Sequence, residues 1–246
     1  MTDPRPDVSS DQEAGSMEGV RLPRQSRSRE TFQNLLDSAR DLMAEGGIEA
    51  VTVQDVIRRA GVGAGSFYAR FDGRETLIRY LHEVEWGEGG RWWRDYLSPA
   101  RWEGWPLAAL VGEIVRVLVR SHFAREPVLR ALWTRAVSRP ADGIMERTAE
   151  WDARFVEAVG RLITDRREEI GHPNPERAAR LAAFQLLTHL RGHLFFPDSL
   201  VLDGHFPLEE LILELTRSVL GYLQSDQAPA SYRELIRASA RPLAPR

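Results

Sequence analysis

The chain has 246 residues, 43% of them hydrophobic, which is enough to bury the core of one large or two small domains. Its formal net charge of −3 does not indicate nucleic-acid binding, so any basic surface must be local. The absence of cysteine excludes a disulfide framework and a thiolate metal site.

Residues 1–20 carry five acidic residues and one arginine, and they lack the apolar run of a signal peptide. This composition predicts a disordered acidic leader. The whole chain also lacks 18 consecutive apolar residues, so we expect no membrane span and a cytoplasmic protein. Met17 stands just before the next segment and is a candidate for the true start of the protein.

The charge changes sign after residue 20. Arg21, Arg24, Arg27 and Arg29 follow with no acid between them. A basic arm ahead of a DNA-binding domain can reach phosphates or the minor groove, and Arg24 and Arg27 are the candidates for such contacts. A solvated tail would have the same composition.

A first helix is predicted after this arm, because its apolar residues recur at helical spacing. Ser26 or Ser28 can cap its start, and Gly46-Gly47 ends it. The apolar stripe consists of Phe32, Leu35, Leu36, Ala39, Leu42 and Met43.

The next segment, residues 52–71, predicts two short helices joined by a glycine turn. Thr52 can cap the first helix, and Gly61 stands where a helix end favours positive φ. The second helix, at about residues 64–71, places Phe67 and Phe71 on one side. This is the helix-turn-helix pattern, in which the second helix enters the major groove of DNA. An ordinary helical hairpin would have the same spacing.

The outer face of the second helix suits contact with DNA. Tyr68 and Arg70 point away from the two phenylalanines and can reach phosphates or base edges. The other residues at the start of this helix are small enough for a phosphate to come close to the backbone: Gly63, Ala64, Gly65 and Ser66.

Residues 52–78 closely resemble the DNA-binding domain of the TetR family of bacterial transcriptional regulators. The matching residues are Thr52, Ala60-Gly61-Val62, Gly65, Tyr68, Phe71, Arg74, Glu75 and Leu77. The family often has Ser where Gly63 stands, so a hydroxyl contact to phosphate is missing, and Lys where Arg74 stands, which keeps the charge but changes its geometry. The resemblance extends over about residues 26–85.

The resemblance implies a homodimer that binds a palindromic double-stranded operator through two such units. The residues expected to face the groove are Ala64, Ser66, Tyr68 and Arg70. Those expected to hold the DNA backbone are Thr52, Gly63, Gly65 and Arg74, with Arg24 and Arg27 reaching from the arm.

Beyond residue 73 nearly every segment has helical periodicity and no strand pattern occurs, so an all-α fold is predicted. We expect a helix-turn-helix domain with its basic arm at 21–72, a helical ligand-binding and dimerisation domain at 73–226, and a tail at 227–246 that can form a short helix. Glycines at 87–90 should break or kink the helix that begins near Arg74. Segments at about 175–196 and 207–224 have more apolar surface than one face uses, and the resemblance implies that they pair across the dimer.

All seven tryptophans follow residue 85. The resemblance implies a ligand cavity in this part of the chain, and an aromatic lining suits an apolar or aromatic effector. Each ring could equally fill the core. The candidate pocket residues are Trp86, Trp105, Phe123, Trp133, Trp151, Phe155, His122 and His189.

The sequence does not indicate an enzyme. The glycines at 61, 63 and 65 follow a helix and do not complete GxGxxG, and neither a P-loop nor GxSxG occurs. His189 and His193 lack the glutamate of HExxH and a third ligand, so we expect no metal and no cofactor. We therefore predict a repressor released from its operator by a small molecule. Activation, and a helical adaptor without DNA binding, are the alternatives.

Overall fold

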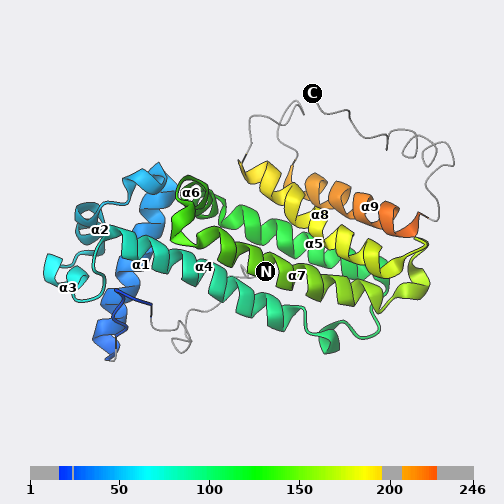
Figure 1. Ribbon diagram of the computed structural model, residues 1–246, viewed down its shortest axis with the longest axis horizontal. Coiled ribbons are helices and arrows are strands. Elements are labelled where there is room, and N and C mark those ends of the chain that lie inside the picture. The colour runs from blue at the N-terminus through cyan, green and yellow to red at the C-terminus, as the bar shows by residue number, and fades with distance from the viewer. Residues whose placement is uncertain (1–16, 24, 196–206, 226–246) are drawn as a thin grey trace, which may run out of the picture.

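The computed structural model describes residues 17–23, 25–195 and 207–225, and these residues have the predicted all-α fold (Figure 1). Their α-helices are α1 (Ser26–Gly46), α2 (Val53–Ala60), α3 (Ala64–Tyr68), α4 (Arg74–Tyr96), α5 (Leu107–Ala124), α6 (Glu126–Ser138), α7 (Ile144–Thr164), α8 (Pro175–Phe195) and α9 (Leu208–Gln224). Short 3₁₀ helices lie between them: η1 (Ile48–Ala50), η2 (Pro99–Trp102), η3 (Pro140–Asp142) and η4 (Arg167–Glu169).

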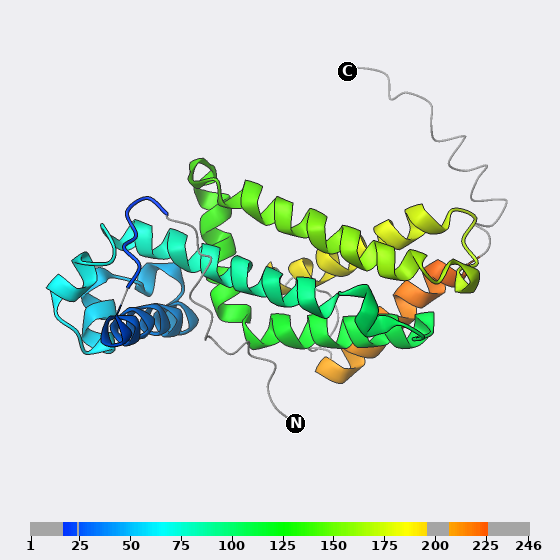
Figure 2. The same ribbon diagram turned by 90° about the horizontal axis from the view of Figure 1, so that it is seen from below.

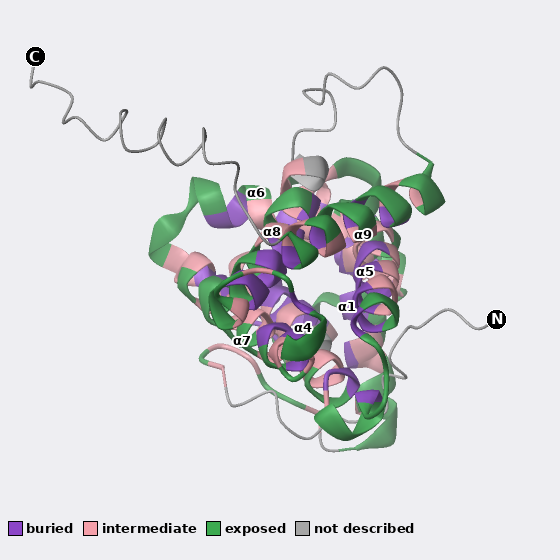
Figure 3. Ribbon diagram, turned by 90° about the vertical axis from the view of Figure 1, so that its right-hand side faces the viewer, coloured by how far each residue is buried: buried purple, intermediate pink, exposed green. Residues whose placement is uncertain are grey.

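The molecule is elongated, with α1, α2 and α3 gathered at one end (Figure 1). The long helix α4 begins at that end and continues beside α7 into a larger helical body. Figure 2 shows the same division after a 90° turn. The helices α8 and α9 pack against each other on the side of the body away from α4 (Figure 3).

Aromatic packing holds the small end together. Phe67 and Phe71 are fully buried, and the ring of Phe71 stacks on Phe32 of α1 at 5.3 Å between centroids. Tyr80 of α4 meets Phe32 edge-on at 5.3 Å. Burial of each such ring stabilises the fold by roughly 1.5–3 kcal/mol, so α1, α3 and α4 form one core.

The helix α6 also belongs to this core, although it comes much later in the chain. Its Leu132 is fully buried in the same cluster as the α1 residues, and Ala131 is nearly so. The body has a separate core centred on α5, whose apolar residues are buried against α7, α8 and α9. Figure 3 shows the buried residues on the facing sides of these helices.

The expected break at residues 87–90 is wrong, because α4 runs unbroken from Arg74 to Tyr96. Glycine lowers helix propensity by roughly 1 kcal/mol, but tertiary packing can outweigh that loss. A β-carbon at Gly90 would overlap the indole ring of Trp151. The absence of a side chain at Gly90 therefore lets α7 place Trp151 directly on α4.

The helix α3 is shorter than expected, because it ends at Tyr68, and α7 covers Ile144–Thr164 with 3₁₀ turns on either side. The predicted tail helix lies outside the described residues. Within the described residues, no helix is both long and apolar enough to cross a membrane.

Candidate functional site

Local hydrogen bonds define the turn between α2 and α3. The hydroxyl of Thr52 accepts the backbone N–H of Asp55 at 3.1 Å, which caps α2 as predicted. Gly61 ends α2 at φ 65°, in the left-handed region that glycine adopts without strain. The N–H of Val62 then donates to the carbonyl of Ile57 at 3.2 Å. These bonds fix the angle at which the chain enters α3.

The outer face of α3 is open to solvent. Phe67 is fully buried, whereas Tyr68 is 54% exposed, so the helix is anchored on one side and free on the other. Ala64 is exposed and Ser66 half-buried. β-Carbons added at Gly63 or Gly65 would meet no atom within 4 Å. Contacts within the described part of the molecule therefore do not require glycine at these two positions.

The two arginines predicted to contact DNA from this region are used inside the protein instead. Arg70 donates to the hydroxyl of Ser28 and, at 3.2 Å, to the carbonyl of Arg21. The expected capping of α1 by Ser26 or Ser28 is wrong, because the helix already begins at Ser26 and its N-cap is Gln25, without a side-chain bond.

Arg74 is half-buried and ties the start of α4 to the segment before α2. Its Nε donates to the carbonyl of Val51 and its Nη2 to that of Ile48, both at 2.6 Å. Its Nη1 donates to Glu75 at 2.8 Å. These bonds make Arg74 a link between α4 and the segment before α2, and its contact with a phosphate stays a prediction.

The segment that leads into α1 lies against α3 and α4. Val20 forms an antiparallel bridge with Phe71, and the N–H of Arg21 donates to the carbonyl of Arg70 at 2.9 Å. The side chain of Arg21 pairs with Asp72 at 2.7 Å. The prediction of disorder does not hold for residues 17–20, since Met17 and Val20 pack against the core, and residues 1–16 lie outside the described residues. Arg27 is exposed, and Arg24 lies outside the described residues.

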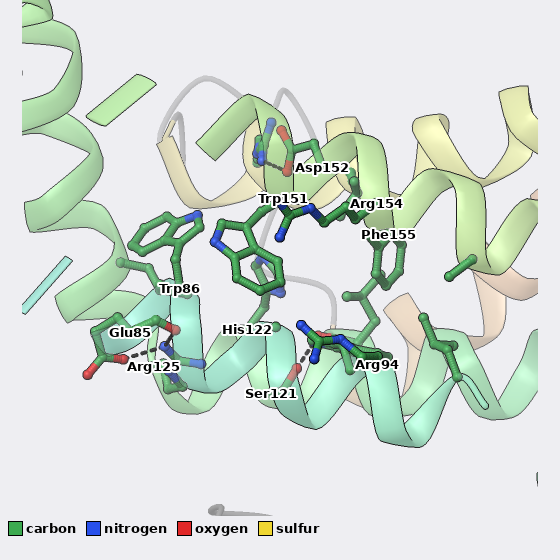
Figure 4. Close-up of a pocket in the computed structure, with 18 of the residues that line it drawn as sticks. Glu85, Trp86, Arg94, Ser121, His122, Arg125, Trp151, Asp152, Arg154 and Phe155 are labelled. Atoms are coloured by element: carbon green, nitrogen blue, oxygen red, sulfur yellow. Dashed lines mark hydrogen bonds and ion pairs between the residues drawn. The ribbon is translucent and has the colours of Figure 1, made fainter. Parts of the chain in front are cut away.

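The body contains a cavity of about 420 Å³ between α4, α5, α6, α7 and α8. Figure 4 shows Trp86 and Trp151 facing its interior, with Phe155 and His122 on its walls. Trp133 also lines it, so the structure places these five candidate residues around one space. Trp93, which was not predicted, lines it too.

Three candidate pocket residues lie elsewhere. Trp105 follows η2 and is 41% exposed at a second depression beside Trp102. Phe123 lies one residue after His122, so it turns away from the cavity and packs on the core of the body. His189 is exposed, and its ring nitrogen pairs with the carbonyl of Gln185 at 2.8 Å. Within the described residues, no group of three or more His, Asp or Glu side chains is placed to hold a metal ion.

A buried carboxylate connects the cavity to the small end. Glu85 of α4 is 9% exposed and accepts Nε of Arg40 from α1 at 2.7 Å. It also pairs with Arg125, whose Nη2 donates to the Glu85 carbonyl at 2.9 Å. Burial alone would raise the pKa of Glu85, but the charges of Arg125 and Arg40 outweigh it and lower that pKa.

Two histidines near the cavity are neutral at pH 7. Burial, with the charges of Arg125 and Arg191, lowers the pKa of His122 to about 4. Burial, with the charge of Arg147, lowers the pKa of His82 to about 3. The ring of His82 stacks on Trp86 at 4.2 Å and supports that wall of the cavity.

Charged residues of the cavity were missed from the sequence. They are Glu85, Arg94, Arg125, Asp152, Arg154, Arg161 and Arg191. On α7 a signal was present, because Trp151, Arg154, Phe155, Ala158 and Arg161 follow the spacing of one helix face. Glu85, Arg94, Arg125 and Arg191 lie on three further segments, and their convergence depends on tertiary packing.

Comparison with known proteins identifies the family. The model described as bacterial regulatory proteins, tetR family, matches residues 35–81, and the model of the tetracyclin repressor-like C-terminal domain matches residues 106–195. The HTH-type transcriptional repressor KstR2 of Rhodococcus jostii (strain RHA1) is 46% identical over 44 residues. That match covers 18% of this chain and only 22% of the relative's length.

Solved structures share the fold at low identity. NalD of Pseudomonas aeruginosa, the secondary repressor of the MexAB-OprM multidrug efflux pump, superposes with a TM-score of 0.59 at 21% identity, covering 82% of this chain and 100% of that chain. GusR of Salmonella enterica gives a TM-score of 0.56 at 21% identity, covering 79% and 96%. With both domains matched, the chain belongs to the TetR family of bacterial regulatory proteins.

Proposed function

We propose that this protein is a dimeric transcriptional repressor that binds a palindromic operator through α3 and leaves it when a small molecule fills the cavity of the body. The observation that best supports DNA binding is that α3 has one buried side and one exposed side. Its Phe67 is fully buried, while the neighbouring Tyr68 is 54% exposed beside residues too small to block a phosphate. Such a helix can present side chains to the major groove.

The candidate contacts differ from those read off the sequence. Ala64, Ser66 and Tyr68 would face the groove, and the open backbone at Gly63 and Gly65 would approach a phosphate. Thr52 and Arg27 are exposed and remain candidates for contacts with the DNA backbone. Arg70 and Arg74 would act indirectly, by holding the arm and the start of α4 in place.

Exposed apolar residues support dimerisation through α8 and α9. Leu181 and Phe184 of α8 are 39% and 53% exposed, and Leu213 of α9 is 47% exposed. These exposed apolar side chains would be buried if the same face of a second copy of the protein packed against them. A two-fold axis there would give two α3 helices for two half-sites.

The route from cavity to operator would use the ion pairs of Glu85. Glu85 and Arg125 both line the cavity, and Glu85 also holds Arg40 of α1. An effector that moves Arg125 would therefore change the contact between α4 and α1. The packing of α6 on α1 gives a second connection beside α4. Coupling of this kind typically amounts to about 1–3 kcal/mol, or roughly 5- to 150-fold in operator affinity.

Selection from random duplex DNA tests the function. The full chain should enrich a palindromic sequence, with retention that falls steeply as salt rises. The Tyr68→Ala variant should lose affinity for that sequence, whereas Val137→Ala, a change at an exposed residue of α6, should not. A helical adaptor would enrich no sequence, and that result would refute the proposal.

A further inference from the structure

The cavity is much more positive than the protein as a whole. Its wall includes five arginines but only two acids, Glu85 and Asp152, whereas the entire chain has a formal net charge of −3. The arginines are Arg94 of α4, Arg125 between α5 and α6, Arg154 and Arg161 of α7, and Arg191 of α8. His122 is neutral and adds no charge at pH 7.

Both acids of the wall are already paired. Glu85 binds Arg125, and also Arg40 from outside the cavity. Asp152 binds Arg191, whose guanidinium lies 5.1 Å from the ring centroid of Trp133. Three arginines of the wall therefore have no acid of the wall as a partner.

These three arginines are available to an incoming anion. Within the described residues, Arg94 has no acidic group in ion-pair distance. Arg154 and Arg161 have only exposed neighbours one helical turn away, Glu150 and Glu157, each at 3.7 Å. Exposed pairs of this kind contribute little, so a better-placed anion can replace them.

Geometry brings two of them to one place. Figure 4 shows Arg94 and Arg154, from opposite walls, extending toward the space beside Trp151. The guanidinium of Arg154 lies 5.1 Å from the ring centroid of Trp151. An anionic group at this point would have arginines on both sides and an aromatic surface next to it.

We propose that the cavity binds an amphipathic anion, whose apolar or aromatic body lies among Trp86, Trp133, Trp151 and Phe155 and whose carboxylate or similar acidic group is held by Arg94 and Arg154, with Arg161 nearby. The role of this anion as an effector rests on the proposed function, whereas its binding in the cavity can be tested without that function. This inference adds an acidic group to the apolar or aromatic effector expected from the tryptophans, because three arginines of the same wall have no acid of the wall as a partner.

A matched pair of fluorescent probes tests the charge preference. The anion 1-anilinonaphthalene-8-sulfonate and the neutral N-phenyl-1-naphthylamine share the same aromatic framework. Titrated into the full chain, the anion should bind more tightly, and its advantage should shrink as salt screens the charges. Bound anion should be displaced by 2-naphthoate but not by 2-naphthamide, which separates a carboxylate from its neutral counterpart.

Variants locate the site. Arg94→Gln and Arg154→Gln should each weaken binding of the anionic probe roughly three- to tenfold, the loss expected for one charge-assisted contact near solvent, and leave the neutral probe unchanged. Arg94→Lys should retain part of the binding because it keeps the charge. The control is Arg167→Gln, at an exposed arginine outside the cavity wall, which should change neither probe.

Equal affinity for the two probes, or equal losses for both in the arginine variants, would overturn the proposal. Charge-selective binding that never alters DNA affinity would support the anion site and count against the effector role in the proposed function. An anion preference that persists unchanged in Arg94→Gln and Arg154→Gln would also overturn the assignment of these arginines, whatever happens to DNA binding.

Discussion

Gly65 is the second residue of α3, with open space where a side chain would be. The Gly65→Ala variant should therefore be more stable to unfolding by roughly 0.5–1 kcal/mol, because alanine is the better helix former. The added methyl group would stand between the α3 backbone and a phosphate, so operator affinity should fall. Urea unfolding and a DNA-binding titration measure the two effects.

The matched control for this change is Gly87→Ala in α4, another helical glycine with nothing within 4 Å of a β-carbon. It should gain similar stability and keep its operator affinity. If Gly65→Ala bound the operator as well as the unchanged protein, the close approach of α3 to DNA would be wrong.

The two neutral histidines give the protein a pH-dependent stability. Their pKa values are lowered to about 4 and about 3 in the fold, whereas an unfolded histidine titrates near 6.5. Between these values the unfolded chain binds protons that the folded chain does not, so stability falls as pH drops below about 6.5, by up to ~1.4 kcal/mol per pH unit for each histidine.

Denaturant unfolding between pH 7.5 and pH 4.5 measures this slope. The His122→Asn variant should show a shallower decline than the unchanged protein, because one of the two groups no longer titrates. The exposed His189 is the comparison, and His189→Asn should leave the slope unchanged. Parallel curves for the unchanged protein and His122→Asn would contradict the buried, neutral state of His122.

At the scale of helices, the ion pairs of Glu85 connect α1, α4 and the start of α6. Arg40 and Arg125 bind the same carboxylate. A double-mutant cycle of Arg40→Gln and Arg125→Gln should therefore give a coupling energy above about 0.5 kcal/mol in unfolding. In a control cycle that pairs Arg40→Gln with Arg167→Gln, the two changes in the free energy of unfolding should simply add. If the changes in unfolding free energy for Arg40→Gln and Arg125→Gln simply added, the two arginines would not be energetically coupled through Glu85.

Helix periodicity predicted an element well where the spacing of apolar residues within that helix determines which face is buried. The stripe from Phe32 to Met43 is buried as expected. The error at Gly90 arose because the deciding contact is Trp151 on another helix. The contacts of Arg70 and Arg74 within the protein were missed for a related reason: their partners, Ser28, Val51 and Ile48, are distant in sequence.

The cavity was predicted in part. Aromatic composition after residue 85 pointed to Trp86, Trp133 and Trp151, which do line it, but could not exclude Trp105. The positive wall could not be predicted in the same way, since its arginines come from α4, α7, α8 and the α5–α6 junction. Which charges share one space depends on how those helices pack.

On the scale of the whole molecule, the exposed residues of α8 and α9 predict how dimerisation can be removed. Phe184→Glu combined with Leu213→Glu should give a monomer by light scattering, because two charges on the paired face would be buried without partners. Far-UV circular dichroism should be unchanged, since both side chains are exposed in one copy. The control is Val137→Glu at a 57% exposed residue of α6, which should remain dimeric.

Hydroxyl-radical footprinting of the full chain on its selected duplex, with the stoichiometry measured in the same solution, tests the central claim most directly. We expect two chains per duplex and two protected half-sites separated by about one helical turn, roughly 10 base pairs or a multiple of it. Protection should disappear with Tyr68→Ala. A protected region without two-fold symmetry, or a single chain per site, would contradict the account of a dimer that reads DNA with two α3 helices.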